Sequence, residues 1–347
     1  MSVCLSVCLS VFATFSNAGP TRPSENLLRA DDPTSCRLDP AIDTADEDAT
    51  VHRLRQMFVD GEHERLDGAL DCLVHARALF RSGRSGAGIV YQFLRQQFPG
   101  PPLDQSEFER VRRWLDRRPE SRFAEFAALR LMYVEAWQVR GMKPDASTPD
   151  EARRLFHQRL AQAAGALSHA APALRDTPLW HSLMFSIALD SREQGADPAA
   201  VFGRAVRRWP RHYDFYEAVS SRMVPRWGGS WAVVDSAIRR WTTRLAASDG
   251  DSLYARLYYS VFAAGSEDPH ASRIDWRRLR RAFDDLNRRY PDPLHANAAA
   301  SFACLHRDPD WYRSALARVD SADVRRAAWL PGTSPEECMR ALQGDGR

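Results

Sequence analysis

Apolar residues recur at helical spacing along almost the whole chain from Val51 onward, and no stretch alternates apolar and polar positions as a strand would. Between Phe123 and Trp137 they occupy most of the circumference of a helix, which predicts a central, buried element. The segments 155–167 and 201–209 carry a narrower apolar face and predict amphipathic helices. The pattern therefore predicts an all-α chain of about 14 helices.

Short polar motifs indicate where these helices begin. Two have the form of a capping box, in which Ser or Thr caps an amide, Pro stands where no N–H is needed, and Glu reaches back. They are Thr148-Pro149-Asp150-Glu151 and Ser334-Pro335-Glu336-Glu337. Four further pairs join a capping residue to proline without the full box: Thr177-Pro178, Asp197-Pro198, Asp292-Pro293 and Asp308-Pro309. So many helix starts predict short helices joined by tight turns.

The predicted helix ends also recur. Four segments end a helix with arginine, usually an aromatic residue, and then proline: Arg95–Pro99, Arg117–Pro119, Arg207–Pro210 and Arg288–Pro291. A new helix follows each, which is the layout of tetratricopeptide-like hairpins. The prolines are 20, 91 and 81 residues apart, so the tetratricopeptide period of about 34 residues is absent. We therefore expect an irregular tetratricopeptide-like helical-hairpin solenoid.

The N-terminus has features of an export signal. Val3–Phe15 is an apolar run that ends at Ser16-Asn17-Ala18, too short to span a bilayer and of the length of a signal-peptide core. No Lys or Arg precedes the run, so a buried helix is the alternative. We expect residues 1–18 to be a signal peptide and 19–50 a polar arm. The helical domain of 51–347 would then be periplasmic or secreted, with no integral membrane segment in the mature chain.

Cysteine positions agree with export. Loss of residues 1–18 leaves Cys36, Cys72, Cys304 and Cys338, one pair near each end. Four cysteines allow three connectivities, and proximity along the chain favours Cys36–Cys72 with Cys304–Cys338. Each disulfide would stabilise the fold by about 3–4 kcal/mol at the ends of the array, where helices have one neighbour only. Four buried thiols of a cytosolic protein are the alternative.

A compact turn occupies Pro225-Arg226-Trp227-Gly228-Gly229-Ser230. Pro225 ends the preceding helix, Gly228 and Gly229 permit backbone angles closed to other residues, and Ser230 is placed to cap the next helix. We expect Trp227 and Trp231 to pack across this corner, with Arg226 over an indole or paired with an acid. A rigid structural corner is the favoured interpretation, and a ligand-contacting one is the alternative.

Together with the aromatic segment 123–157, this turn resembles a bacterial domain-of-unknown-function family of tetratricopeptide-like helical proteins. The resemblance covers about residues 110–245. It implies a helical-repeat fold and no established chemistry, so it carries over no catalytic residue.

Motifs for metal or cofactor chemistry are missing from the sequence. There is no Cys-x-x-Cys, Asp67 stands where a zincin would have its second histidine after His63, and Gly83–Gly88 lacks the Lys-Ser/Thr of a P-loop. Cys72 with His75 and Cys304 with His306 supply too few ligands for zinc. We expect no metal and no cofactor, and a helix-breaking loop at Gly83–Gly88.

Charge leaves one candidate surface. The chain has 48 basic and 45 acidic residues, a formal charge of +3, so no nucleic acid is expected as a partner. The segment from Arg273 to Arg289, however, contains seven arginines and only three aspartates. Trp276, Leu279, Phe283 and Leu286 would form the buried stripe of that helix. Arg277, Arg278, Arg280 and Arg281 are the candidate partner-binding residues, and a solvated face is the alternative.

We therefore expect a non-catalytic interaction module of the bacterial envelope that binds another protein or peptide, as an adaptor, assembly factor or neutralising factor. The alternative is an envelope hydrolase that uses Glu125 or Glu135, which stand within the apolar helix where burial could raise a carboxyl pKa. Pairing of these carboxylates with arginine would remove that alternative.

Overall fold

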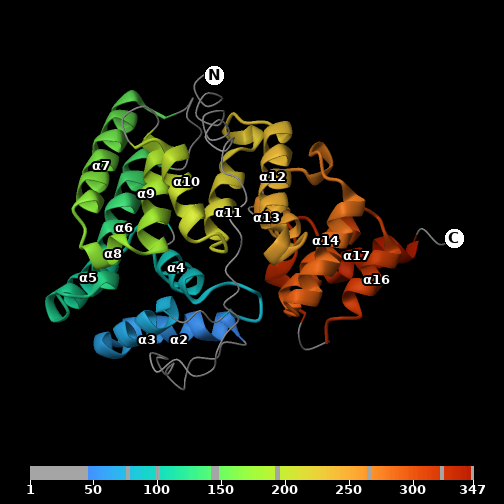
Figure 1. Cartoon of the computed structure of the whole chain (residues 1–347), viewed down its shortest axis with the longest axis horizontal. Helices are drawn as coiled ribbons and strands as arrows, with labels where there is room; N and C mark the ends of the chain where they lie inside the picture. The colour runs from blue at the N-terminus through green and yellow to red at the C-terminus, as the bar shows by residue number, and fades with distance from the viewer. Residues whose placement is uncertain are drawn as a thin grey trace. The chain divides into compact units, whose positions relative to one another are not determined.

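The computed structural model describes residues 46–75, 79–98, 100, 102–141, 148–191, 196–263, 267–320 and 324–344. Within these ranges the chain forms sixteen α-helices, α2 to α17, and short 3-10 turns (Figure 1). No strand occurs there, and a single isolated antiparallel bridge joins Leu79 to Ser85. The predicted all-α helical-hairpin architecture is confirmed.

Contacts divide the chain into two compact units. The described part of the N-terminal unit comprises residues 46–80 and 84–215, and that of the C-terminal unit comprises residues 81–83 and 216 onward. Hairpin packing of helices that follow one another, such as α6 on α7 and α15 on α16, dominates within each unit.

The N-terminal unit is built around one central helix. That helix, α6, has ten buried residues among its nineteen, as its apolar circumference predicts. Helices α5, α7, α8 and α9 pack on it. The helices of this unit are α2 (Glu47–Asp60), α3 (His63–His75), α4 (Gly86–Gln97), α5 (Gln105–Arg117), α6 (Arg122–Arg140), α7 (Asp150–Ser168), α8 (Pro172–Arg175), α9 (Pro178–Ser191) and α10 (Pro198–Arg208), and the unit ends within α11 (Asp214–Arg222).

The C-terminal unit has an aromatic core. The Phe302 ring lies 6.1 Å from Phe262, 6.3 Å from Trp276 and 5.5 Å from Phe283. Tyr254 and Tyr258 are fully buried. The elements are η2 (Pro225–Trp227), α12 (Trp231–Asp249), α13 (Ser252–Ala263), η3 (Pro269–Ala271), α14 (Trp276–Arg289), α15 (Pro293–Leu305), α16 (Pro309–Leu316), η5 (Arg326–Ala328) and α17 (Pro335–Gly344).

Most predicted helix starts are present with their capping bonds. The side-chain oxygens accept backbone N–H groups of the first turn at Thr177, Asp197, Asp292, Asp308 and Ser334. In the Ser334 box the hydroxyl also donates to Glu337 at 2.9 Å. At α7 the N-cap position is Pro149, one residue later than Thr148, because Pro149 itself is extended (φ −58°, ψ 146°). Local capping chemistry thus sets most of the boundaries.

The arginine–aromatic–proline ends share one backbone conformation. The C-caps of α4, α5, α10 and α14 have φ between −126° and −136° and ψ between 66° and 84°, and each precedes a proline in the sequence. A proline excludes the residue before it from the α region. The feature that recurs in this irregular array is therefore the backbone conformation of the turn. The spacing of these turns along the sequence follows no fixed period.

Gly83–Gly88 is only partly the predicted loop. Gly83 has φ +83°, but Gly86 and Gly88 lie in the first turn of α4, where the Ser85 hydroxyl caps the Gly88 N–H. A Cβ at Gly86 would stand 2.0 Å from the Leu73 carbonyl oxygen. This glycine is needed for the close approach of α4 to α3, which the sequence pattern does not reveal.

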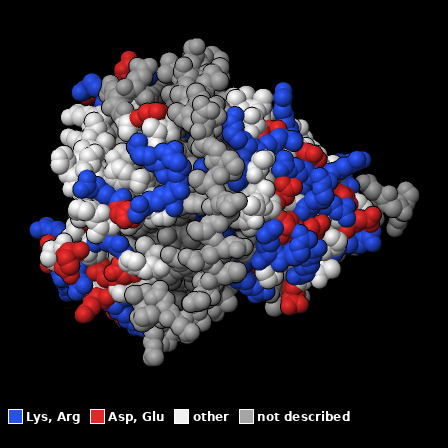
Figure 2. All heavy atoms as spheres, viewed as in Figure 1, with Lys and Arg blue, Asp and Glu red and all other residues white. Residues whose placement is uncertain are grey.

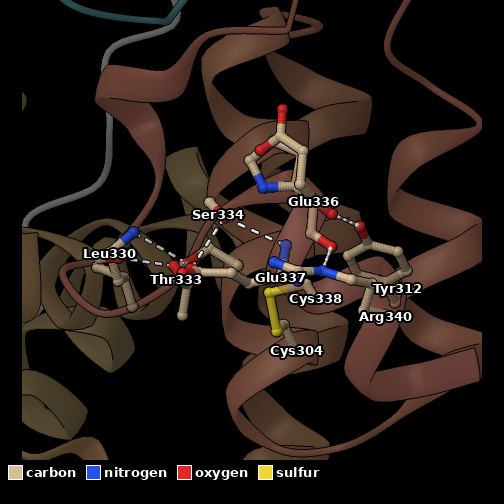
Figure 3. Close-up of a disulfide and its surroundings, with 11 residues drawn as sticks. Cys304, Tyr312, Leu330, Thr333, Ser334, Glu336, Glu337, Cys338 and Arg340 are labelled. Carbon is tan, nitrogen blue, oxygen red and sulfur yellow. Dashed lines mark hydrogen bonds between the residues drawn. A yellow bond between two sulfur atoms is a disulfide. The ribbon is translucent and has the colours of Figure 1, made fainter. Parts of the chain in front are cut away.

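A disulfide joins Cys304 at the end of α15 to Cys338 in α17, with the Cα atoms 5.5 Å apart (Figure 3). Beside it the Tyr312 hydroxyl donates to the Pro335 carbonyl at 3.0 Å. This predicted pair is confirmed. At the other end, Cys72 is buried in α3 and is disulfide-bonded. Cys36, the predicted signal peptide and residues 19–45 of the predicted arm lie outside the described residues, so the Cys36–Cys72 pairing stays a prediction. The last residues assigned to the arm, 47–50, belong to α2 instead, because Asp46 caps that helix through the Asp48 and Ala49 N–H groups.

Among the helices that the structure describes, none has both the length and the hydropathy required to cross a bilayer.

Candidate functional site

Helix α14 separates apolar and charged residues more sharply than its neighbours. It begins where Asp275 accepts the Arg278 N–H at 2.9 Å. Leu279, Phe283 and Leu286 of the predicted stripe are buried, and Trp276 is half-buried. The helix therefore presents its arginines on the opposite side.

The four candidate arginines fall into two pairs with different surroundings. Arg278 donates to Asp251 at 2.8 Å, and its guanidinium lies 4.5 Å from the centre of the Tyr254 ring. Arg280 donates to Asp308 at 3.1 Å. Both are half-buried and hold the fold together. Arg277 and Arg281 are exposed and form no ion pair or hydrogen bond with any residue that the structure describes.

Arg277 and Arg281 stand four residues apart, so they lie on one side of the helix. Arg288, seven residues further, falls on the same side and shares its charge with Asp285. We call Arg277, Arg281 and Arg288 the arginine face. Figure 2 shows basic side chains gathered over α14 on the viewed face of this unit. Asp284, between them, is paired with Arg318 at 2.9 Å, so it does not neutralise the face.

An aromatic stack adjoins the start of α14. The Trp276 indole is stacked on the His306 ring, with centroids 4.4 Å apart and planes within 6°. The His270 ring lies 5.8 Å from the same indole. Both imidazoles are exposed and Trp276 is half-buried. A planar, partly exposed stack of this kind can support a bound polypeptide beside the arginine face.

The turn Pro225–Ser230 is held by close backbone packing and a capping hydrogen bond. Gly228 has φ +87°, and a Cβ on Gly229 would stand 1.8 Å from the Met223 carbonyl oxygen. The Ser230 hydroxyl caps α12 through the Val233 N–H at 3.3 Å, as predicted. The Arg226 guanidinium lies 5.1 Å from the Trp227 ring centre, and the Trp231 ring lies 5.4 Å from Phe262. These contacts are those of a structural corner.

Of the two carboxylates of the hydrolase alternative, Glu125 is engaged by the backbone. Both oxygens of Glu125 accept the Ala171 N–H, at 3.0 and 3.3 Å, which fixes the chain just before α8. Glu135 is half-buried on the same helix. The backbone contact gives Glu125 a positioning role within the fold.

Sequence reasoning missed a buried cluster in the N-terminal unit. His212 Nε2 lies 3.4 Å from the Ser182 hydroxyl and 3.7 Å from an Asp214 oxygen, and burial lowers the pKa of this histidine. A catalytic triad needs the carboxylate on the other ring nitrogen and an exposed hydroxyl. Here both partners meet one nitrogen, and His212 and Ser182 are buried. The cluster therefore does not form a nucleophile.

No group of three His, Cys, Asp or Glu side chains among the described residues is placed to hold a metal ion. His75, a ligand considered from the sequence, bonds through Nδ1 to the Asp71 carbonyl at 2.8 Å.

Comparison with models of protein families, with curated proteins and with solved structures finds no match for this chain. The resemblance of residues 110–245 to a helical family thus stays a prediction, and the functional argument depends on the arginine face itself.

Proposed function

We propose that this chain is an exported, non-catalytic protein-binding module of the bacterial envelope, an adaptor, assembly factor or neutralising factor whose arginine face binds an acidic segment of its partner. The observation that carries the proposal is the contrast on α14. Arg278 and Arg280 are paired within the fold, whereas Arg277 and Arg281 are exposed and unpaired among the described residues.

The chemistry of the face favours a carboxylate-bearing partner. Like charges four residues apart on a helix repel by about 0.2–0.5 kcal/mol, and a bound acidic segment removes that repulsion. A guanidinium can hold a carboxylate through two parallel hydrogen bonds, which a point charge cannot do. Acidic residues on a partner would therefore gain affinity and orientation together.

Two features support export. The apolar run Val3–Phe15 has the length of a signal-peptide core. The disulfide Cys304–Cys338 is of the kind that persists in oxidising compartments. The hydrolase alternative loses one of its two candidate carboxylates, because Glu125 accepts the Ala171 N–H.

The test is affinity capture of C-terminally tagged protein from its own host, in wild-type form and in two charge-reversed forms. The test variant is Arg277→Glu with Arg281→Glu. The control is Arg113→Glu with Arg117→Glu on α5, two exposed arginines with the same spacing and no ion pair within the described residues. Intact mass of the captured chain reports its N-terminus and disulfides.

We expect one near-stoichiometric companion polypeptide with wild type and with the α5 control, and its loss with the α14 variant. The mature chain should begin at Gly19 and be lighter by two hydrogens for each disulfide. Equal capture by all three proteins would refute the role of the arginine face. A full-length chain with free thiols would refute export.

A further inference from the structure

A small pocket in the C-terminal unit has acidic and apolar walls. It has a volume of about 250 Å³ and is lined by Glu267, Asp268, Phe262, Leu305, Leu330 and two prolines. Glu267 and Asp268 stand just before η3, and Leu305 ends α15. None of the described residues that line this pocket is basic.

One carboxylate oxygen in this lining is unsatisfied. Glu267 Oε1 is buried, and no hydrogen-bond donor among the described residues reaches it. The neighbouring Asp268 accepts the His270 N–H at 2.9 Å, which leaves its negative charge in place. A carboxylate that is partly shielded from water and lacks a donor is unfavourable, and a cation in the pocket would meet the negative charge of Glu267.

The walls define the shape of that cation. Phe262, Leu305 and Leu330 offer apolar contact, which suits an alkyl stem that carries a charged head. The volume lies below the roughly 300–1,000 Å³ of sites for drug-sized ligands. A single lysine or arginine side chain has the required size, stem and charge.

The pocket adjoins the aromatic stack at the start of α14. His270 follows Pro269 of the lining, and His306 follows Leu305, and both imidazoles contact Trp276 at the start of α14. We propose that this pocket receives a lysine or arginine side chain of the same partner protein whose acidic segment meets the arginine face. This inference rests on the proposed function and adds a basic anchor residue to the partner.

The first test uses a defined probe on the full chain. Nα-acetyl-arginine amide is titrated against the protein by ligand-observed NMR, beside Nα-acetyl-citrulline amide, which has the same shape and no charge. We expect the arginine probe to bind about 10- to 100-fold more tightly, the usual effect of a charge-assisted hydrogen bond. Equal affinity of the two probes would overturn the proposal.

Variants locate the binding. Glu267→Gln should remove the preference for arginine over citrulline, whereas Glu109→Gln, an exposed glutamate of α5, should keep it. An unchanged preference in Glu267→Gln would overturn the proposal, since the charge would then be recognised elsewhere. The comparison of two probes on wild-type protein needs no variant, so a poorly folded Glu267→Gln protein would leave the proposal testable.

Capture of the partner separates this inference from the proposed function. Loss of the companion with Glu267→Gln, together with the probe preference, supports the pocket. If the α14 variant loses the companion while Glu267→Gln retains it, the pocket proposal fails and the proposed function stands. If neither variant loses it, both fail, even where the arginine probe binds.

Discussion

Helices α5 and α14 are built alike and differ in charge. Each buries an apolar stripe, with Val111 and Trp114 in α5 and Leu279 and Phe283 in α14, and each starts at a capping aspartate. Helix α5 contains four arginines and three acidic residues, a net charge of +1. Helix α14 contains six arginines and two acidic residues, a net charge of +4. Amphipathic patterning thus explains how both helices pack, whereas the charge surplus distinguishes a candidate binding surface from an ordinary one.

The exposed arginines of α5 also act within their own unit. His63 lies stacked near Trp114 with ring centres 6.1 Å apart, and its pKa is lowered first by burial and then by Arg117 and Arg113. Arg277 and Arg281 of α14 have no such contact among the described residues. This difference supports our proposal that α14 binds a partner, whereas the arginines of α5 act within the fold.

The largest expected effect concerns what the two helices share. Trp114→Ala and Phe283→Ala each remove a buried aromatic ring, so each should lower the free energy of unfolding by about 3–5 kcal/mol. Urea denaturation measures both, with Arg112→Ala, an exposed change in α5, as the control within about 0.5 kcal/mol. A small loss in only one variant would break the structural equivalence of the helices.

The next effect concerns the helix starts. Asp275→Ala removes the side chain that accepts the Arg278 N–H, and should lower the free energy of unfolding by about 1 kcal/mol. Asp275→Asn should restore most of it, because asparagine caps equally well. Asp104→Ala should act in the same direction in α5, where a full capping box is present. Equal stability of the Ala and Asn variants in thermal denaturation would contradict this account.

A pH experiment sharpens the difference. The pKa of His63 in the folded protein lies below its ordinary value of 6.5. As the pH falls, His63 is therefore protonated in the unfolded chain before it is protonated in the folded one. The free energy of unfolding should therefore fall as the pH drops below about 6.5, and His63→Gln should flatten that part of the profile. Arg113→Gln with Arg117→Gln should raise the pKa of His63, measured by NMR of its ring protons. An unmoved pKa would show that burial alone lowers it.

The smallest effect is the most diagnostic of function. Arg277→Gln with Arg281→Gln should change the free energy of unfolding by less than about 0.5 kcal/mol, because exposed, unpaired residues contribute little to the fold. A slight gain at low ionic strength should vanish in high salt, as the repulsion between the arginines is screened. A large loss of stability would reassign these arginines to the fold and end the contrast with α5.

What could be predicted from the sequence was largely local. Asp197, Asp292 and Asp308 cap helices because each needs only the amides that follow it, so their motifs sufficed. The buried stripe of α14 follows from its periodicity for the same reason. The sequence identified the candidate helix and its cluster of arginines. It did not indicate which of these arginines are paired within the fold and which are exposed.

Which arginines are paired depends on residues distant in the chain. Arg278 and Arg280 are paired because Asp251 and Asp308 stand 27 and 28 residues away and fold back onto α14. Likewise Asp67 collects hydrogen bonds from Trp114, Arg118 and Ser121, which follow it by 47 to 54 residues. No short motif encodes such meetings, and Gly86 shows the same limit for close backbone approach.

The Cys304–Cys338 bond has a mechanical consequence. Its two cysteines are 34 residues apart in sequence, yet their Cα atoms stay 5.5 Å apart however hard the chain is pulled. A force applied to the two ends of the chain would be transmitted through the disulfide. Helix α16, which lies in the loop that the disulfide closes, would carry no tension. The extension released when the unit ruptures would be about 110–120 Å shorter than for an open chain, at roughly 3.3–3.6 Å per residue. A reducing agent would restore that length in a single-molecule pulling experiment.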